Sequence, residues 1–425
     1  MSPIAVLLIL FFVTLFIGVP FAWSLTISCV ASLCMMSGYP LMTVVQKMYN
    51  GGAKYTLLAI FFFMLAGAIM QHGGISSRLV NFSKALLGHI RGGLSIAVLG
   101  VCMMFAALSG SSIATTAAIG GMMYPELVKE KYPEGYAAAL PVAGGTLGIV
   151  IPPSIVFVVY GATTGTSVSK LLMSGVIPGV MAGVFMCIYA YFYARKHNIP
   201  KSDRFDMKRL AVAFKESVWA LLMPIIILGG IYSGLFTPTE SAAVAVVYGL
   251  FVAVFVHREM TPDKLFRISI DAVKGTANIL LLIMAASMFG YVLTVYQFPA
   301  LFTELMSTFI SGRITFLLFL NILLIILGML MDSGAIILII APLVYPMAVS
   351  FGIDPVHLGC IIVFNLAVGQ ATPFGNCLFA AIPATGQDIL TLAKNALPFI
   401  VILFATVFLV SYVPVFSMLL PSMMK

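Results

Sequence analysis

Polar residues and glycines interrupt long apolar runs at four places in the chain, residues 109–112, 148–154, 332–334 and 369–376. A helix that breaks inside a membrane leaves backbone carbonyl groups without helical partners, which is tolerated only where they are buried in protein or face water. Carbonyl, hydroxyl and carboxylate oxygens suit a hard cation such as Na⁺ better than a transition metal. The four breaks therefore predict cation sites with oxygen ligands.

Each of the two predicted cation sites combines one polar tip with one broken helix. The first site would use the oxygens of Ser109, Ser111, Gly148, Ile151 and Pro153. The second would use the oxygens of Asp332, Gly334, Gly369, Thr372 and Gly375. Asp332 is the one acid that the sequence places deep in an apolar run, where an ionisable residue indicates a functional site. Its alternative role is to cap the helix that follows.

A ligand bound between the two tips would meet further polar side chains. The candidates are Ser112, Thr115, Thr116, Ser154, Thr163, Gln370 and Asn376. None of them is basic, so an anion would depend on helix N-termini and on the bound cations. The alternative is that the glycines and prolines of these segments only permit close helix packing or a kink.

The composition indicates which kind of chain carries these breaks. Of the 425 residues, 61% are apolar and 8% are charged, whereas a globular domain is about 25% charged. So few charges could not cover a soluble fold of this length. The apolar runs are also continuous, unlike the alternating strands of a membrane barrel. We therefore expect an all-α polytopic membrane protein.

The remaining composition argues against several other classes of protein. The net charge of +8 comes from short loops between apolar runs, which favours membrane orientation over a nucleic-acid partner. The six cysteines and five histidines show neither metal-ligand spacing nor a catalytic pairing. We expect the lipid bilayer as a partner, no nucleic acid and no enzymatic activity.

The apolar runs divide the chain into two halves with the same plan. In the first half (1–194) we expect scaffold spans within 4–70, an interfacial arm at 73–91, a re-entrant hairpin at 94–132, a broken helix at 135–163 and a span at 171–193. A cytoplasmic linker follows at 195–217. In the second half (218–425) we expect scaffold spans at 218–256 and 279–296, an arm at 299–313, a hairpin at 315–350, a broken helix at 356–384 and a span at 397–419.

Landmarks in the two halves keep a nearly constant separation of 218 to 221 residues along the chain. The pairs Ser111 and Asp332, Pro125 and Pro346, Gly148 and Gly369, and Pro152 and Pro373 are each 221 residues apart. Because the register holds over a long stretch, the matches indicate an internal duplication. Each half is then expected to hold five spans and one hairpin.

Five spans is an odd number, so the second half must be inverted relative to the first. If the hairpin base at 129–131 is cytoplasmic, 17 of the 22 Lys and Arg residues lie inside and 5 lie outside, as the positive-inside rule requires. Both termini are therefore predicted on the outer side. Inverted repeats whose helices break near the membrane midplane are typical of secondary transporters.

Five segments of the chain resemble the large membrane subunit of tripartite ATP-independent periplasmic (TRAP) transporters. They are residues 105–125 (FAALSGSSIATTAAIGGMMYP), 144–154 (GGTLGIVIPPS), 235–242 (LFTPTESA), 332–346 (DSGAIILIIAPLVYP) and 369–376 (GQATPFGN). The likeness covers essentially the whole chain. The chain is also similar, more distantly, to the divalent-anion/Na⁺ symporters of the ion transporter superfamily.

The resemblance implies partners and a mechanism that the residues alone do not. Such subunits work in the bacterial inner membrane with a small four-helix membrane subunit and a periplasmic substrate-binding protein. The outer side, on which the charge distribution places both termini, would then be the periplasm. They import organic acids with two or more co-transported Na⁺ ions, by an elevator motion of the hairpin-containing domain. The overall likeness favours a sialic acid substrate, with a C4-dicarboxylate next. The alternative is a stand-alone carboxylate/Na⁺ symporter or antiporter of the same superfamily.

Overall fold

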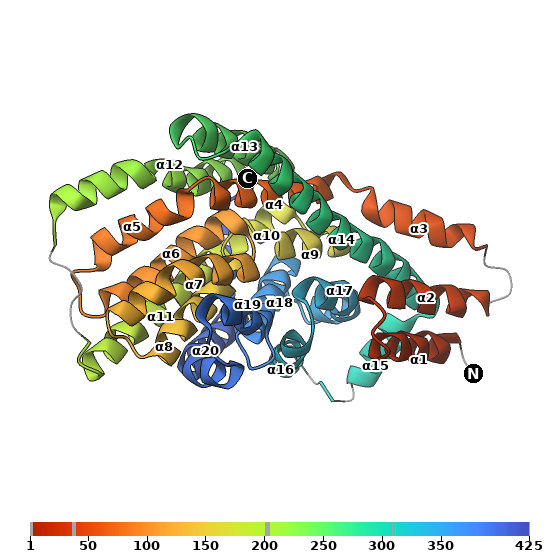
Figure 1. The fold of residues 1–425 in the computed structure, drawn as a ribbon. Helices are drawn as coiled ribbons and strands as arrows, with labels where there is room; N and C mark the ends of the chain where they lie inside the picture. The colour runs from red at the N-terminus through yellow and green to blue at the C-terminus, as the bar shows by residue number, and fades with distance from the viewer. Residues whose placement is uncertain (1–2, 36–39, 200–204, 308, 311, 425) are drawn as a thin grey trace.

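A computed structural model describes residues 3–35, 40–199, 205–307, 309–310 and 312–424. Within these residues the regular secondary structure is helical throughout (Figure 1), which confirms the predicted all-α class. The centre of the predicted linker (200–204), positions 308 and 311 of the second predicted arm, and Lys425 lie outside the described residues.

The described helices fall into the two halves as follows. The first half contains α1 (Pro3–Phe16), α2 (Phe21–Cys34), α3 (Met42–Gly52), η1 (Tyr55–Leu57), α4 (Leu58–His72), α5 (Ile75–Leu87), α6 (Gly93–Ser109), α7 (Ser112–Lys129), α8 (Glu134–Gly145), η2 (Thr146–Ile149), α9 (Ile155–Thr164), α10 (Val168–Ser174) and α11 (Val176–Lys196). The second half contains α12 (Met207–Tyr232), α13 (Pro238–Phe251), the π-helical η3 (Val252–Val256), α14 (Pro262–Val295), α15 (Phe298–Ser307), α16 (Arg313–Leu330), α17 (Ser333–Ser350), α18 (Pro355–Gln370), α19 (Asn376–Thr385), α20 (Ile389–Tyr412) and α21 (Val415–Met423).

Polar N-cap residues explain where helices begin at three of the four breaks, whereas α19 at the fourth follows Gly375 and has no side-chain cap. A side-chain oxygen accepts a hydrogen bond from the first turn of the helix at Ser111 (α7), Ser154 (α9), Asp332 (α17), Asp354 (α18) and Asp388 (α20). Each cap satisfies a backbone N–H that has no partner inside its own helix. The caps therefore stabilise the starts of these five helices.

The two halves exchange packing partners. The hairpin arm α7 of the first half packs against α19 of the second, and the corresponding arm α17 packs against α9 of the first. In the same way α2 packs against α14, and α13 packs against α4. This reciprocal pairing is what a pseudo-two-fold relation between two duplicated halves produces.

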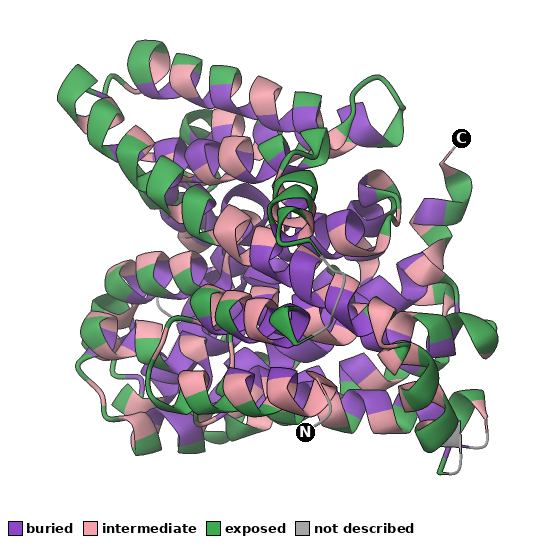
Figure 2. Cartoon of the chain, turned by 90° about the vertical axis from the view of Figure 1, so that its right-hand side faces the viewer, coloured by how far each residue is buried: buried purple, intermediate pink, exposed green. Residues whose placement is uncertain are grey.

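The outside of the helical bundle is apolar, as a lipid-facing surface requires. Eight helices among the described residues are long and apolar enough to cross a membrane. Buried residues gather in the centre of the bundle, and exposed ones lie along the outer helices (Figure 2). Large apolar side chains such as Phe16, Phe255 and Ile314 are exposed there. Helices α1 and α2 have 14 residues each, fewer than the roughly 20 that a straight span needs.

The structure differs from the predicted elements at the linker and in the scaffold. The predicted linker 195–217 ends in helix, because Asp206 caps the start of α12 at Met207. The predicted span 279–296 is the end of the longer helix α14, which begins where Thr261 caps a first turn that contains Pro262. Helix α3 lies within the predicted scaffold region 4–70, but with 11 residues it is too short to be one of its spans.

The last predicted span, 397–419, is not one helix. It divides into α20 and α21 at Val413 and Pro414. Val413 leaves the helical conformation (φ −119°, ψ 86°), as the residue before a proline tends to do. The span itself starts earlier than predicted, at the capped Ile389.

Candidate functional site

The tip of the first hairpin is held together by its own hydroxyl groups. Gly110 joins α6 to α7 with a left-handed backbone (φ 62°), and a β-carbon on it would lie 2.6 Å from the Pro153 carbonyl oxygen. The Thr115 hydroxyl donates to the carbonyl of Ser111 (2.8 Å) and lies 2.9 Å from the Ser109 hydroxyl. Ser109 and Thr115 therefore shape the tip.

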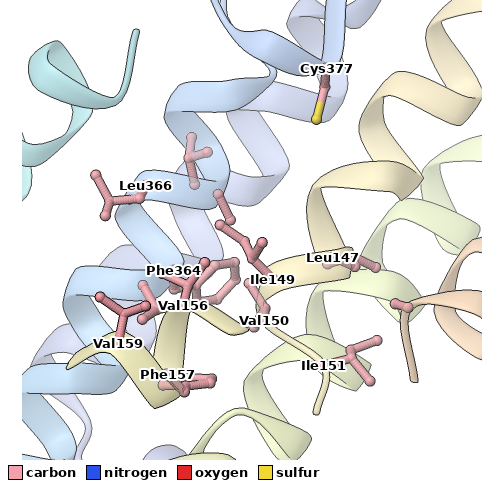
Figure 3. Packing of buried hydrophobic residues seen from close by; sticks show 14 of the residues in the cluster. Leu147, Ile149, Val150, Ile151, Val156, Phe157, Val159, Phe364, Leu366 and Cys377 are labelled. Carbon is pink, nitrogen blue, oxygen red and sulfur yellow. The ribbon is translucent and has the colours of Figure 1, made fainter. Parts of the chain in front are cut away.

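The first broken helix packs directly against this tip. A β-carbon on Gly148 would lie 2.5 Å from the carbonyl oxygen of Ser111, so the two backbones touch here. The Ser154 hydroxyl donates to the carbonyl of Ile149 at 2.6 Å across the break. Apolar side chains of this segment, such as Ile149 and Val156, pack against α18, which contributes Phe364 to the contact (Figure 3). The break is thus buried in the protein.

The tip of the second hairpin carries the carboxylate. Asp332 caps α17 by accepting a hydrogen bond from the Gly334 N–H at 2.8 Å, so the capping role is observed. The neighbouring Ser333 is buried and accepts a hydrogen bond from the Gln370 side-chain amide at 2.8 Å. This bond ties the second tip to the end of α18.

The second broken helix forms a tight turn of carbonyl groups. The Thr372 hydroxyl donates to the carbonyl of Gly369, and the Gly375 N–H donates to the carbonyl of Thr372 at 2.7 Å. A β-carbon on Gly375 would collide with the Gln370 carbonyl, so glycine is required at this close approach. The turn leaves α19 to start at Asn376, which is half-buried.

Both tips open into one cavity of about 140 Å³. Its wall contains the predicted residues Ser111, Ser112, Asp332, Gly334 and Gln370. Among the described residues that line it there is no Lys or Arg, and Asp332 is the single acid. The cavity therefore offers hydroxyl, amide and carboxylate oxygens to a ligand, together with the starts of α7 and α17.

The other predicted substrate residues lie outside this cavity wall. Ser154 is fully buried in the first break, and Thr115 is buried in the first tip. Thr163 donates to the carbonyl of Val159 and lines a separate cavity nearer the end of α9. Apart from the nearby Cys377 thiol, the buried hydroxyl groups of Thr116 and Ser112 have no partner among the described residues.

The structure adds wall residues that the sequence analysis did not select. Ser333 could have been found, since it lies 221 residues after Ser112 and so occupies the same place in the repeat. Ile279 and Leu282 supply the wall on the α14 side. No sequence signal distinguishes these two from the other apolar residues of α14.

Comparison with known proteins confirms the resemblance. Residues 8–416 match the family described as Tripartite ATP-independent periplasmic transporter, DctM component. The C4-dicarboxylate TRAP transporter large permease protein DctM of Pseudomonas aeruginosa is 42% identical over 94% of each chain. The sialic acid TRAP transporter large permease protein SiaM of Vibrio cholerae is 34% identical over 96% of each chain.

A solved structure shares the fold. The crystal structure of the Alcanivorax borkumensis YdaH transporter, described as having an unusual topology, superposes with a TM-score of 0.62 over 89% of this chain and 87% of that chain. Its sequence is 15% identical, so it supports the fold alone. The family match includes both hairpins and both broken helices, and the chain belongs to the DctM family of TRAP transporter components.

Proposed function

We propose that this chain is the transport subunit of a Na⁺-driven TRAP transporter that imports an organic acid. The observation that carries the proposal is the single cavity into which both hairpin tips open. Family membership makes the chain a transporter subunit, and the cavity gives that subunit a place for its ligands.

Na⁺ coupling is supported by the oxygen groups at the two tips. Near the first tip, the Ser111 carbonyl faces Gly148, and near the second, the Asp332 carboxylate shares the cavity wall with Gln370 at the end of α18. Oxygen-only ligand sets with little charge favour hard cations. A bound Na⁺ at each tip would supply the positive charge that the cavity wall lacks, and an organic anion could then bind between them.

The size of the cavity favours a small acid as the substrate. A cavity of about 140 Å³ is close in size to one that holds a single benzene ring, and a nine-carbon sugar acid is far larger. The more similar of the two relatives is also the one named for C4-dicarboxylates. We therefore place a C4-dicarboxylate ahead of sialic acid, reversing the order that the overall sequence likeness suggests.

An elevator motion is supported by the way the central helices pack. One arm of each hairpin (α7, α17) packs against the broken helix of the opposite half, and the other arm (α6, α16) packs against that of its own half, so the two tips and the two breaks form one block. The cavity wall opposite this block comes from α14 of the predicted scaffold. Movement of the block past α14 would carry the cavity contents across the membrane.

The proposal includes two partners and a location. As a TRAP large subunit, the chain works with a periplasmic substrate-binding protein and a small membrane subunit. We place the assembly in the bacterial inner membrane, with both termini of this chain in the periplasm because of the distribution of basic residues.

The test is uptake by proteoliposomes that contain this chain with its small subunit and its binding protein. We expect accumulation of a radiolabelled C4-dicarboxylate with an inward Na⁺ gradient and none with K⁺ in its place, with sialic acid as the second substrate tried. Uptake that ignores Na⁺ would contradict the coupling. Uptake by this chain alone would favour the stand-alone symporter or antiporter instead.

A further inference from the structure

Three cavities lie in a row between the predicted outer face and the hairpin tips. An outer cavity of about 410 Å³ and a middle cavity of about 240 Å³ share Lys54 and Ala162 as wall residues. The middle cavity and the tip cavity share Leu338. Because neighbouring cavities share wall residues, each lies directly beside the next.

The walls of the outer and middle cavities carry several hydroxyl groups and, among the described residues, a single charged side chain. Hydroxyl groups line them at Thr166, Thr237, Thr239, Thr163, Ser287 and Thr294. Among the described residues of these two walls, Lys54 is the one Lys or Arg, and no Asp or Glu contributes. The nearby Glu240 carboxylate accepts hydrogen bonds from the backbone N–H and the hydroxyl of Thr237. It therefore forms part of the capping box at the start of α13.

Lys54 occupies the neck where the outer and middle cavities meet. Its ammonium group donates to the carbonyl of Ala162 near the end of α9. An ammonium group has three donors, so donors remain for a ligand. Lys54 is also one of only five basic residues that the charge distribution places on the outer face, where the positive-inside rule predicts few.

We infer that the row of cavities is the entry route of the substrate anion and that Lys54 is the residue that first receives it. This inference rests on the proposed import of an organic acid. An arriving carboxylate would accept hydrogen bonds from the donors of the ammonium group that the Ala162 carbonyl leaves free.

The test measures the charge preference of the route without measuring transport. Ser287→Cys places a thiol in the middle cavity, and intact cells expressing the full complex are treated from outside with an anionic (sulfonatoethyl) or a cationic (trimethylammonium-ethyl) methanethiosulfonate reagent. Peptide mass spectrometry quantifies labelling at position 287. We expect Lys54→Gln to lower the anionic-to-cationic rate ratio about tenfold and Lys54→Glu to lower it further. Lys54→Arg should keep the ratio.

The matched control is Lys47→Gln in the same Ser287→Cys background. Lys47 is also predicted on the outer face, but its ammonium lies over the Tyr291 ring, 4.3 Å from the centroid. The Lys47→Gln substitution should leave the anionic-to-cationic labelling ratio unchanged. A ratio unaffected by Lys54→Gln would overturn the role of Lys54.

Labelling at Ser169→Cys in the outer cavity with none at position 287 would overturn the route. The two conclusions can fail separately, because the labelling needs neither Na⁺ nor uptake. A shifted ratio together with absent organic-acid uptake would leave the anion route standing and refute the proposed function.

Discussion

At the residue scale, Asp332 combines a structural and a chemical role. Its carboxylate caps α17 through the Gly334 N–H and also lines the cavity between the tips. An alanine substitution removes both roles at once, so its effect on transport could not be assigned. Asparagine separates them, because Asn caps helices about as well as Asp but carries no charge.

We predict that Asp332→Asn leaves the assembled complex intact and raises the Na⁺ concentration for half-maximal uptake about tenfold, because one negative charge near the cation is lost. Uptake measured against Na⁺ concentration tests this. The matched control is Asp388→Asn, which alters the cap of α20 away from the cavity. Hydrogen bonds from Thr391 and Leu390 keep the pKa of Asp388 below its ordinary value, so the control also removes a charge. An unchanged Na⁺ dependence in Asp332→Asn would remove Asp332 from the cation site.

Sequence reasoning located the cavity residues that end or begin a helix, because capping and helix breaks leave a signature in residue types. Ser111 and Asp332 are of this kind. It did not locate Ile279 and Leu282, which line the cavity only because of how α14 packs. It also grouped Thr163 with the tips, although Thr163 lies in the wall of the middle cavity.

At the element scale, the contact between the first hairpin and the first broken helix depends on a glycine. The Ser111 carbonyl and the Ser112 nitrogen, 2.5 Å and 2.8 Å from the position of a Gly148 β-carbon, are both backbone atoms. Backbone cannot move aside as a flexible side chain can. Any side chain at position 148 must therefore push the tip away from the break.

We predict that Gly148→Ala destabilises the protein by about 1–3 kcal/mol, the usual cost of overpacking, and weakens Na⁺-dependent uptake. Thermal unfolding of the purified complex measures the first effect. Gly121→Ala in the same hairpin is the control, since a β-carbon there meets nothing within 4 Å. Equal melting temperatures for the two variants would contradict the close contact.

Hydropathy predicts the apolar part of a helix, but it does not predict the polar turns by which some helices extend past that part. Helix α14 extends through the basic segment that was expected to be a loop, because charges outside the membrane do not stop a capped helix. Helix α3 was not predicted, since it is short and mixes apolar residues with Lys47 and two glycines. The last predicted span divides at Pro414 because proline interrupts a helix. Hydropathy does not register this, since it measures how apolar a residue is and not whether the residue fits a helix.

At the scale of the whole molecule, the inverted topology is the strongest remaining prediction. Alkaline phosphatase fused after residue 424 should be active, because the C-terminus is predicted in the periplasm. A fluorescent protein inserted after Phe205 should fluoresce, because the linker is predicted in the cytoplasm. An inactive phosphatase at the C-terminus would mean that the two halves are not inverted as their charges suggest.

The exchanged packing of the two halves also has a consequence for synthesis. Helix α7 is made long before α19, the helix that covers it. At about 5–20 residues per second, the first hairpin waits roughly ten to fifty seconds for this partner. During that interval the hydroxyl groups of Ser112 and Thr116 lack the neighbouring Cys377 thiol of α19. A ribosome that stalls after the linker would therefore leave a half-chain with an uncovered polar hairpin, a suitable target for membrane quality-control proteases.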